Sequence, residues 1–123
     1  MPLRLDTGKK DLEMFFKKWQ VESLRYLWKI YPEGAISRVV HENVNKSLQD
    51  GISRTSIVIF LNDMLDEGLI TYTVTTGKGG HYGIYSIKYN ETEFQEHMAK
   101  LIISKLLREY PEATRKTLLN LDV

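Results

Sequence analysis

The spacing of apolar residues changes once along this chain of 123 residues, and that change constrains the fold more than any other feature. As far as Leu65, apolar residues recur every three or four positions, which is typical of helices packed against a core. Beyond Gly68, residues 69–75 and 82–89 alternate in polarity and are rich in β-branched and aromatic residues. The glycine-rich segment 76–81 lies between them. The sequence therefore predicts a set of helices followed by one β-hairpin.

Two helices are predicted in the first part of the chain. A long helix should span about residues 10–31, because its apolar residues form two clusters with helical spacing. It should end before Pro32, since proline disfavours helix in the residue that precedes it. A short helix should follow at about residues 37–43. The residues of this region that should face inward are Ile36, Val39 and Val40.

The third predicted helix is the best defined. Ser53 should cap it, because the serine hydroxyl can accept a hydrogen bond from a free N–H group in the first turn. Gly68 should end it, and residues 45–52 ahead of it are predicted to form a loop or a frayed helix end. A helix, a short helix, a third helix and a hairpin, in this order, form a winged helix-turn-helix.

Two further helices are predicted after the hairpin. Thr92 and Gln95 fit a capping box that opens a long helix, which should continue to about Tyr110 and stop before Pro111. A last helix should cover about residues 112–121. The expected fold class is thus mainly α with a small β-hairpin (α+β). The expected domains are an N-terminal helical arm (1–18), a winged-helix DNA-binding domain (19–89) and C-terminal dimerisation helices (90–123).

Composition narrows the possible functions. The chain has no cysteine, and its three histidines are far apart, so we expect neither a metal site nor a cofactor. No serine or histidine lies in a recognisable nucleophile setting, so we do not expect an enzyme. No apolar run is long enough for a membrane span and the first residues lack a secretory signal, which together favour the cytoplasm. The net charge of +1 permits DNA binding but does not require it.

The third predicted helix carries the main candidate site. Ile57, Leu61, Met64 and Leu65 should face the core, which leaves the opposite face of its N-terminal half free for the major groove. There an arginine can pair with guanine or a phosphate, an asparagine can read adenine, and apolar groups can contact thymine methyls. The alternative is that the polar residues are merely solvated. The candidate DNA-binding residues on this helix are Arg54, Thr55, Ser56, Val58, Ile59 and Asn62.

Further phosphate contacts are expected outside the third helix. Lys78 and His81 lie at the glycine-rich hairpin tip, which can approach a DNA backbone closely. The alternative is an ordinary flexible turn. Arg38 and Lys46, near the second helix, are additional candidates.

The long helix after the hairpin has more apolar surface than one narrow stripe. A second copy of the chain can cover it, and two-fold dimers are the commonest oligomers. The N-terminal helix, with its apolar cluster of residues 12–19, can instead fold back over it, and the two arrangements are compatible. The residues predicted to form a dimer interface are Phe94, Met98, Leu101, Ile102, Leu106 and Tyr110.

Three stretches of the chain resemble the penicillinase-repressor family of winged-helix regulators, which includes the β-lactamase and methicillin-resistance repressors. Residues 22–28 (ESLRYLW) are similar to the family's Glu-x-Leu/Met-x-x-Leu/Ile-Trp pattern. Residues 54–57 (RTSI), followed by Leu61, Met64 and residues 67–70 (EGLI), are similar to its third-helix pattern. The C-terminal helices match in length and placement.

The resemblance implies a homodimeric repressor bound to a palindromic DNA operator through its third helices, with the C-terminal helices at the dimer interface. One departure from the family pattern concerns the exposed face of the third helix, where members carry basic residues and this chain has Asn62, Asp63 and Asp66. The second hypothesis is therefore a winged-helix protein–protein adaptor without DNA binding. The sequence identifies no small-molecule or protein effector for either.

Overall fold

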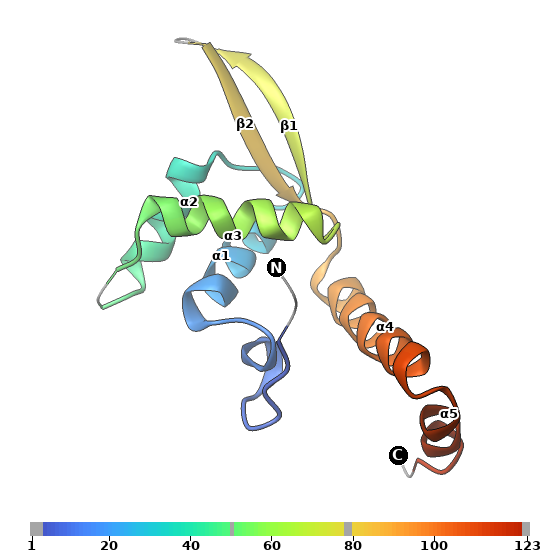
Figure 1. The fold of residues 1–123 in the computed structure, drawn as a ribbon. Helices are drawn as coiled ribbons and strands as arrows, with labels where there is room; N and C mark the ends of the chain where they lie inside the picture. Colours follow the sequence, from blue (N-terminus) through green and yellow to red (C-terminus); the bar gives the residue numbers. More distant parts are fainter. Residues whose placement is uncertain (1–3, 50, 78–79, 122–123) are drawn as a thin grey trace. The chain divides into compact units, whose positions relative to one another are not determined.

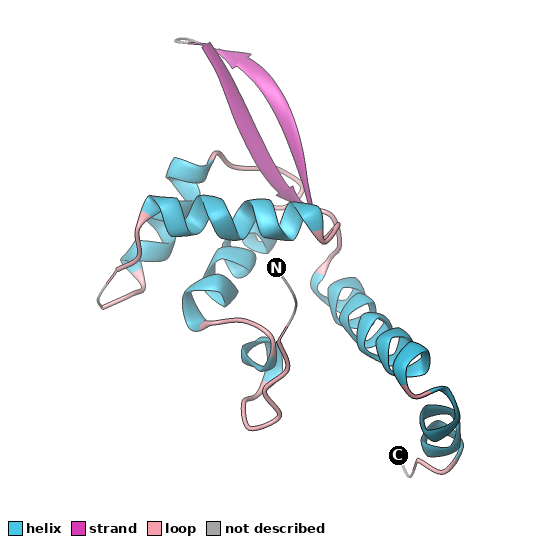
Figure 2. Cartoon of the chain, viewed as in Figure 1, coloured by secondary structure: helices cyan, strands magenta, loops and turns pink. Residues whose placement is uncertain are grey.

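The fold is that of a computed structural model, which describes residues 4–49, 51–77 and 80–121. It divides into two compact units, residues 1–89 and residues 90–123. The first unit contains a 3₁₀-helix and three α-helices, η1 (Asp11–Met14), α1 (Lys18–Lys29), α2 (Ser37–Lys46) and α3 (Arg54–Asp66), followed by strands β1 (Ile70–Gly77) and β2 (Gly80–Ile87) (Figure 1). The second unit contains α4 (Glu91–Glu109) and α5 (Pro111–Leu119). The predicted α+β fold class, mainly helical with one hairpin in a winged-helix-like layout, is confirmed (Figure 2).

The prediction of one long helix over residues 10–31 is wrong. The chain forms the short η1, turns, and starts α1 only at Lys18. The Gln20 side chain accepts a hydrogen bond from the backbone N–H of Lys17 (2.8 Å) and so caps the start of α1. Leu12 of η1 and Phe16 in the turn that follows it are both buried. The apolar cluster that suggested a continuous helix is therefore part of the core of the first unit.

Phe60 of α3 lies at the centre of the aromatic part of this core. Its ring makes edge-to-face contacts with Phe16 and Trp19, at centroid distances of 5.9 Å and 5.5 Å. Phe60 is almost completely buried, as its place in the apolar repeat with Ile57, Leu61 and Met64 indicates. Other core residues come from all parts of the unit: Leu24, Leu27, Val40, Val44, Ile57, Leu61, Met64, Leu69, Ile70 and Ile87.

The ends of α3 agree with the sequence prediction. Ser53 caps the helix, because its hydroxyl accepts a hydrogen bond from the backbone N–H of Ser56 (3.1 Å). Gly68 has a φ of +75°, the left-handed conformation that commonly follows a helix. Leu65, expected in the core, is only half-buried.

The preceding helix α2 continues to Lys46, three residues beyond its predicted end. Val44 in this last turn is buried against the core, and the Asn43 side chain donates a hydrogen bond to the Val39 carbonyl.

The hairpin pairs residue for residue, from Ile70 with Ile87 at its base to Gly77 with Gly80 near its tip. Only its base is anchored in the core, and the two strands extend from the helical part of the first unit as a ribbon (Figure 1). The Trp28 indole N–H donates a hydrogen bond to the carbonyl of Tyr89 (2.9 Å), which ties the end of this unit back to α1.

In the second unit, Asn90 and Glu93 form the capping box that opens α4, so its assignment to Thr92 and Gln95 is wrong. The Asn90 side chain accepts a hydrogen bond from the backbone N–H of Glu93 (2.8 Å). In return, the Glu93 carboxylate accepts one from the backbone N–H of Asn90 (3.1 Å). Asn90 takes this role because its extended backbone (φ −68°, ψ 172°) is the cap conformation, whereas Thr92 is already helical. Helix α5 starts at Pro111 itself, a favoured first position for proline.

Within the described ranges, no helix combines the length and apolarity needed to cross a membrane.

We predict that Phe60→Ala lowers the free energy of unfolding by about 3–5 kcal/mol, because it removes a buried ring and leaves a cavity beside Phe16 and Trp19. Urea unfolding followed by circular dichroism measures this loss. Ile59→Ala is the matched control, since the neighbouring Ile59 is 57% exposed and its truncation should change stability by only about 0.5 kcal/mol. Similar losses in the two variants would contradict the packing described above.

Candidate nucleic-acid interface

One face of α3 is turned away from the core along its whole length. Thr55, Ile59, Asn62 and Asp66 lie four, three and four residues apart, and all four are exposed. Arg54, at the first position of the helix, is exposed beside them. The opposite face carries the buried residues of the core. Helix α3 therefore presents a continuous outer row of polar, apolar and finally acidic side chains.

Two of the candidates on α3 contribute less surface than predicted. Ser56 and Val58 were expected to be exposed, but both are half-buried. The Ser56 hydroxyl lies 2.9 Å from that of Ser53, so it belongs to the hydrogen-bonded cap of the helix. The exposed candidates on this helix are Arg54, Thr55, Ile59 and Asn62.

Two arginines lie near the N-terminal end of α3. The Arg54 guanidinium donates a hydrogen bond to the Ser37 hydroxyl at the start of α2 (3.4 Å). The neighbouring Arg38 pairs with Glu42 (3.3 Å), so its charge is partly neutralised. Lys46 is exposed at the end of α2. The structure thus brings Arg54 together with the start of α2, where Arg38 also lies.

The acidic end of α3 is distant from Arg54. At 1.5 Å per residue, Asp66 lies about 18 Å along the helix axis from Arg54. The Debye length is about 10 Å at 0.1 M salt, so repulsion by Asp66 is weak for an anion held at Arg54. Asp63 is closer to the middle of the helix and is half-buried. Asp66 therefore does not prevent the N-terminal half of α3 from approaching an anionic surface.

Two side chains of α2 hold the turn that leads into α3. His41 Nε2 lies 2.7 Å from the carbonyl oxygen of Ile52, and the Asn45 side-chain oxygen accepts a hydrogen bond from the Ile52 N–H (2.7 Å). Ile52 immediately precedes the cap residue Ser53. His41 and Asn45 thus position the start of α3, a role that the sequence analysis did not identify because it requires contacts seven and eleven residues apart.

The hairpin carries the second group of candidates. His81 is exposed near the tip and lies 3.4 Å from the Thr76 hydroxyl, whereas Lys78 falls outside the described residues. The sequence contains no acidic residue between Glu67 and Glu91, so the hairpin has no carboxylate that would repel a phosphate. Tyr72 and Val74 are 44% and 62% exposed and share one face of the ribbon.

A tyrosine connects the hairpin to α3. Tyr85 of β2 donates a hydrogen bond from its hydroxyl to the Asn62 side-chain oxygen (3.0 Å). Its ring packs on that of Tyr72, its cross-strand partner, at 5.0 Å between centroids. Tyr72 in turn lies over Gly83, where a Cβ atom would overlap the Tyr72 ring. Strand alternation could have placed Tyr72 and Tyr85 on one face, but not the bond to Asn62.

Comparison with protein-family models, curated proteins and solved structures yields no match to this chain. The geometry of α3, the hairpin and the second unit is therefore the basis for any functional conclusion.

The second unit contains the residues predicted to form a dimer interface. Phe94 and Met98 are buried in the single chain and offer little surface to a partner, and the dimer interface itself stays a prediction. Leu101 and Ile102 are half-buried, and Leu106 and Tyr110 are exposed. None of residues 99–121 is buried. Exposed apolar side chains that the prediction did not include are Ile103, Leu118, Leu119 and Leu121.

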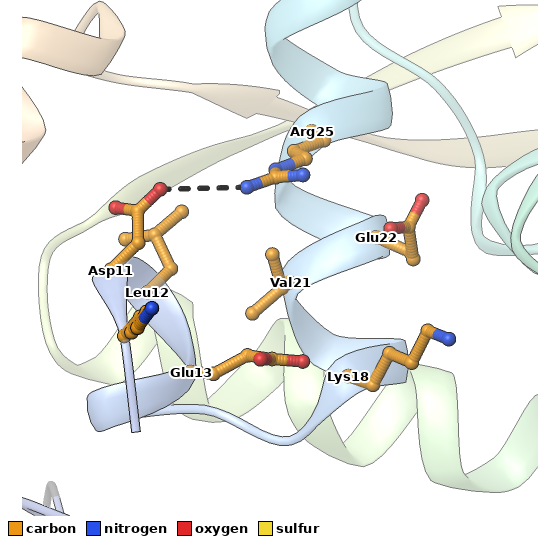
Figure 3. A pocket seen from close by; sticks show the side chains of 8 residues that line it. Asp11, Leu12, Glu13, Lys18, Val21, Glu22 and Arg25 are labelled. Carbon is orange, nitrogen blue, oxygen red and sulfur yellow. Dashed lines mark ion pairs between the residues drawn. The ribbon is translucent and has the colours of Figure 1, made fainter. Parts of the chain in front are cut away.

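The first unit also has an open pocket of about 300 Å³ between η1 and α1 (Figure 3). Charged residues of both signs line it, and two of them, Asp11 and Arg25, form an ion pair across it (3.6 Å). Val21 contributes apolar surface. A mixed, open lining of this kind does not select one class of ligand. The described part of the chain contains no cluster of three or more histidine and carboxylate side chains that could hold a metal ion.

We predict that Gly83→Ala destabilises the protein by about 1–3 kcal/mol, because the added methyl group displaces the Tyr72 ring. The same substitution in a Tyr72→Ala background should cost less than about 0.5 kcal/mol, since the overlapping ring is gone. Thermal or urea unfolding of the four proteins measures the difference. An equal cost in both backgrounds would show that Tyr72 does not lie over Gly83.

Proposed function

We propose that this protein binds duplex DNA as a homodimer and regulates transcription, with α3 as the recognition helix in the major groove. The single observation that carries this proposal is the exposed N-terminal half of α3, capped by Ser53 and bearing Arg54, Thr55 and Ile59 beside a projecting hairpin. In helix-turn-helix proteins, the N-terminal half of the recognition helix, which corresponds to α3, contacts base edges. The role is one of binding, not of catalysis.

The side chains support a particular division of contacts. Arg54 and Lys46 supply charge for phosphates, and Thr55 can donate to a phosphate at the helix start. Ile59 can pack on thymine methyl groups, and Asn62 can pair with adenine. The carboxylate-free hairpin would lie along the flanking backbone or minor groove, with His81 and Lys78 near its tip.

The homodimer is proposed from the second unit. Its 34 residues are too few to form a stable core alone, and α5 has no buried residue. On α4, Ile103, Leu106 and Tyr110 follow one another at three- and four-residue spacing, which forms an exposed apolar stripe. A second copy related by two-fold symmetry would cover this stripe with its own. The two recognition helices would then contact palindromic half-sites about one helical turn apart, or a multiple of it.

The resemblance of α1 and α3 to the penicillinase-repressor family supports repression as the regulatory outcome. A repressor of this kind acts in the cytoplasm, where it blocks access of the polymerase to a promoter. The surface described above does not identify an inducer.

A second candidate function is a winged-helix adaptor that binds another protein. The observation that favours it is the apolar character of the exposed surface, where Ile59, Tyr72 and Val74 are each more than 40% exposed. The aspartates on α3 and the net charge of +1 also favour an adaptor over a DNA-binding protein. The two candidates differ in how binding depends on salt, because phosphate contacts release counterions and protein contacts do not.

We predict that Arg54→Ala weakens DNA binding and lowers the slope of log affinity against log salt concentration by about one, as expected for the loss of one phosphate contact. Fluorescence anisotropy on duplexes selected by the wild-type protein from a random pool measures both quantities. Arg115→Ala is the control, because Arg115 is exposed on α5 outside the proposed interface. If the wild-type protein binds no duplex at about 50 mM salt, the adaptor replaces the DNA regulator.

We predict that Leu106→Asp converts the protein from a dimer to a monomer, because it places a charge in the apolar stripe of α4. Sedimentation velocity measures the molecular mass in solution. Arg108→Asp introduces the same side chain at an exposed position on the opposite face of α4 and should leave the dimer intact. A monomeric wild-type protein, or dimers of both variants, would contradict the proposed interface.

A further inference from the structure

The amide of Asn62 is exposed on α3 and is nevertheless held by the hairpin. Asn62 lies in the outer row of the helix with Thr55 and Ile59. Its side-chain oxygen accepts the hydrogen bond from the Tyr85 hydroxyl (3.0 Å), across 23 residues of sequence. An exposed asparagine ordinarily samples several rotamers. This contact restricts Asn62 to the orientation in which its oxygen faces Tyr85.

Tyr85 is well suited to act as a fixed support. Its side chain is 7% exposed, and its backbone is paired on both sides, with Tyr72 in the hairpin and with Ala35 through two hydrogen bonds of 2.9 Å. Burial, with a smaller effect of Tyr72, raises the pKa of the Tyr85 hydroxyl above its usual value, so the hydroxyl keeps its proton at neutral pH. It therefore remains a hydrogen-bond donor.

The bond leaves Asn62 free to read a base. An amide oxygen has two lone pairs, so after accepting from Tyr85 it can still accept a second hydrogen bond. The amide nitrogen keeps its two donors. Bidentate pairing with adenine in the major groove requires one such acceptor and one such donor, to N6 and N7. A side chain already held in one orientation also loses less rotamer entropy on binding.

We propose that Tyr85 is a positioning residue for base recognition: from the hairpin it orients the Asn62 amide so that α3 prefers adenine at one position of its DNA site. This inference rests on the proposed DNA-binding function and adds to it the base that one residue reads and the residue that orients it. It also gives the hairpin a role in sequence preference that is separate from any backbone contact at its tip.

The test compares the wild-type protein with Tyr85→Phe, Asn62→Ala and the double variant. Duplexes are first selected from a random pool by the wild-type protein, and each A·T pair of the selected site is then changed singly to G·C. Asn62→Ala should reduce the preference for adenine at one position by about 5- to 150-fold, the range expected for one bidentate pair. Tyr85→Phe should reduce the preference at that same position by about 2- to 10-fold, with unchanged affinity for non-specific duplex. In the Asn62→Ala background, Tyr85→Phe should have no further effect.

Tyr72→Phe is the matched control. It removes the hydroxyl from the other ring of the same pair without touching the bond to Asn62, so it should leave the base preference unchanged. A second variant, Asn62→Asp, keeps an acceptor for Tyr85 but loses the amide donors. It should abolish the adenine preference while its melting temperature stays close to that of the wild type.

Three results would overturn the inference in distinguishable ways. Equal loss of affinity for all duplexes in Tyr85→Phe would make Tyr85 a purely structural residue. A further loss of adenine preference on adding Tyr85→Phe to Asn62→Ala would show that Tyr85 does not act through Asn62. Absence of duplex binding by the wild-type protein at low salt would instead overturn the proposed function itself, and this inference with it.

Discussion

The packing of Phe60 determines which residues α3 exposes. The Phe16 and Trp19 rings make edge-to-face contacts with it, so the segment before α1 and the start of α1 hold α3 at one rotation about its axis. A rotation that released Phe60 would bury Ile59, its neighbour, and turn the outer row toward the core. Burial of one aromatic side chain thus contributes both to the stability of the first unit and to the identity of its exposed surface.

The outer surface of α3 that results has few charged side chains and several hydrogen-bonding or apolar side chains. Arg54 is the main cation at the start of α3, whereas Arg38 is paired with Glu42. In the proposed complex with DNA, so few free cations beside α3 would make counterion release a small part of the affinity, and base contacts and the second subunit would have to supply the rest. The orientation of Asn62 and the exposure of Ile59 would serve such base contacts. The exposed stripe of α4 would supply the second subunit.

Several local features could be predicted because they depend on neighbouring residues. The Ser53 cap, the turn at Gly68 and the hairpin follow from side-chain chemistry within three or four residues and from the change of hydrophobic period. Other local predictions failed where two patterns competed. Thr92 and Gln95 have the residue types of a capping box, but Asn90 and Glu93 also do, and the backbone at Asn90 has the required conformation. The break before Lys18 was missed because Leu12 in η1 and Phe16 in the turn after it are both buried and have the four-residue spacing of a helix.

Periodicity along the chain was enough to predict the succession of helices and one hairpin, and the exposure of Arg54, Thr55, Ile59 and Asn62 on α3, because helical and strand patterns extend over consecutive residues. It did not predict the break between η1 and α1. Only the tertiary structure decided that Tyr85 bonds Asn62, that His41 and Asn45 hold the turn into α3, and that Phe94 and Met98 are covered within one chain. The physical reason is distance along the chain. These facts depend on how separate elements pack, and a local pattern contains no information about a partner that folding brings from elsewhere.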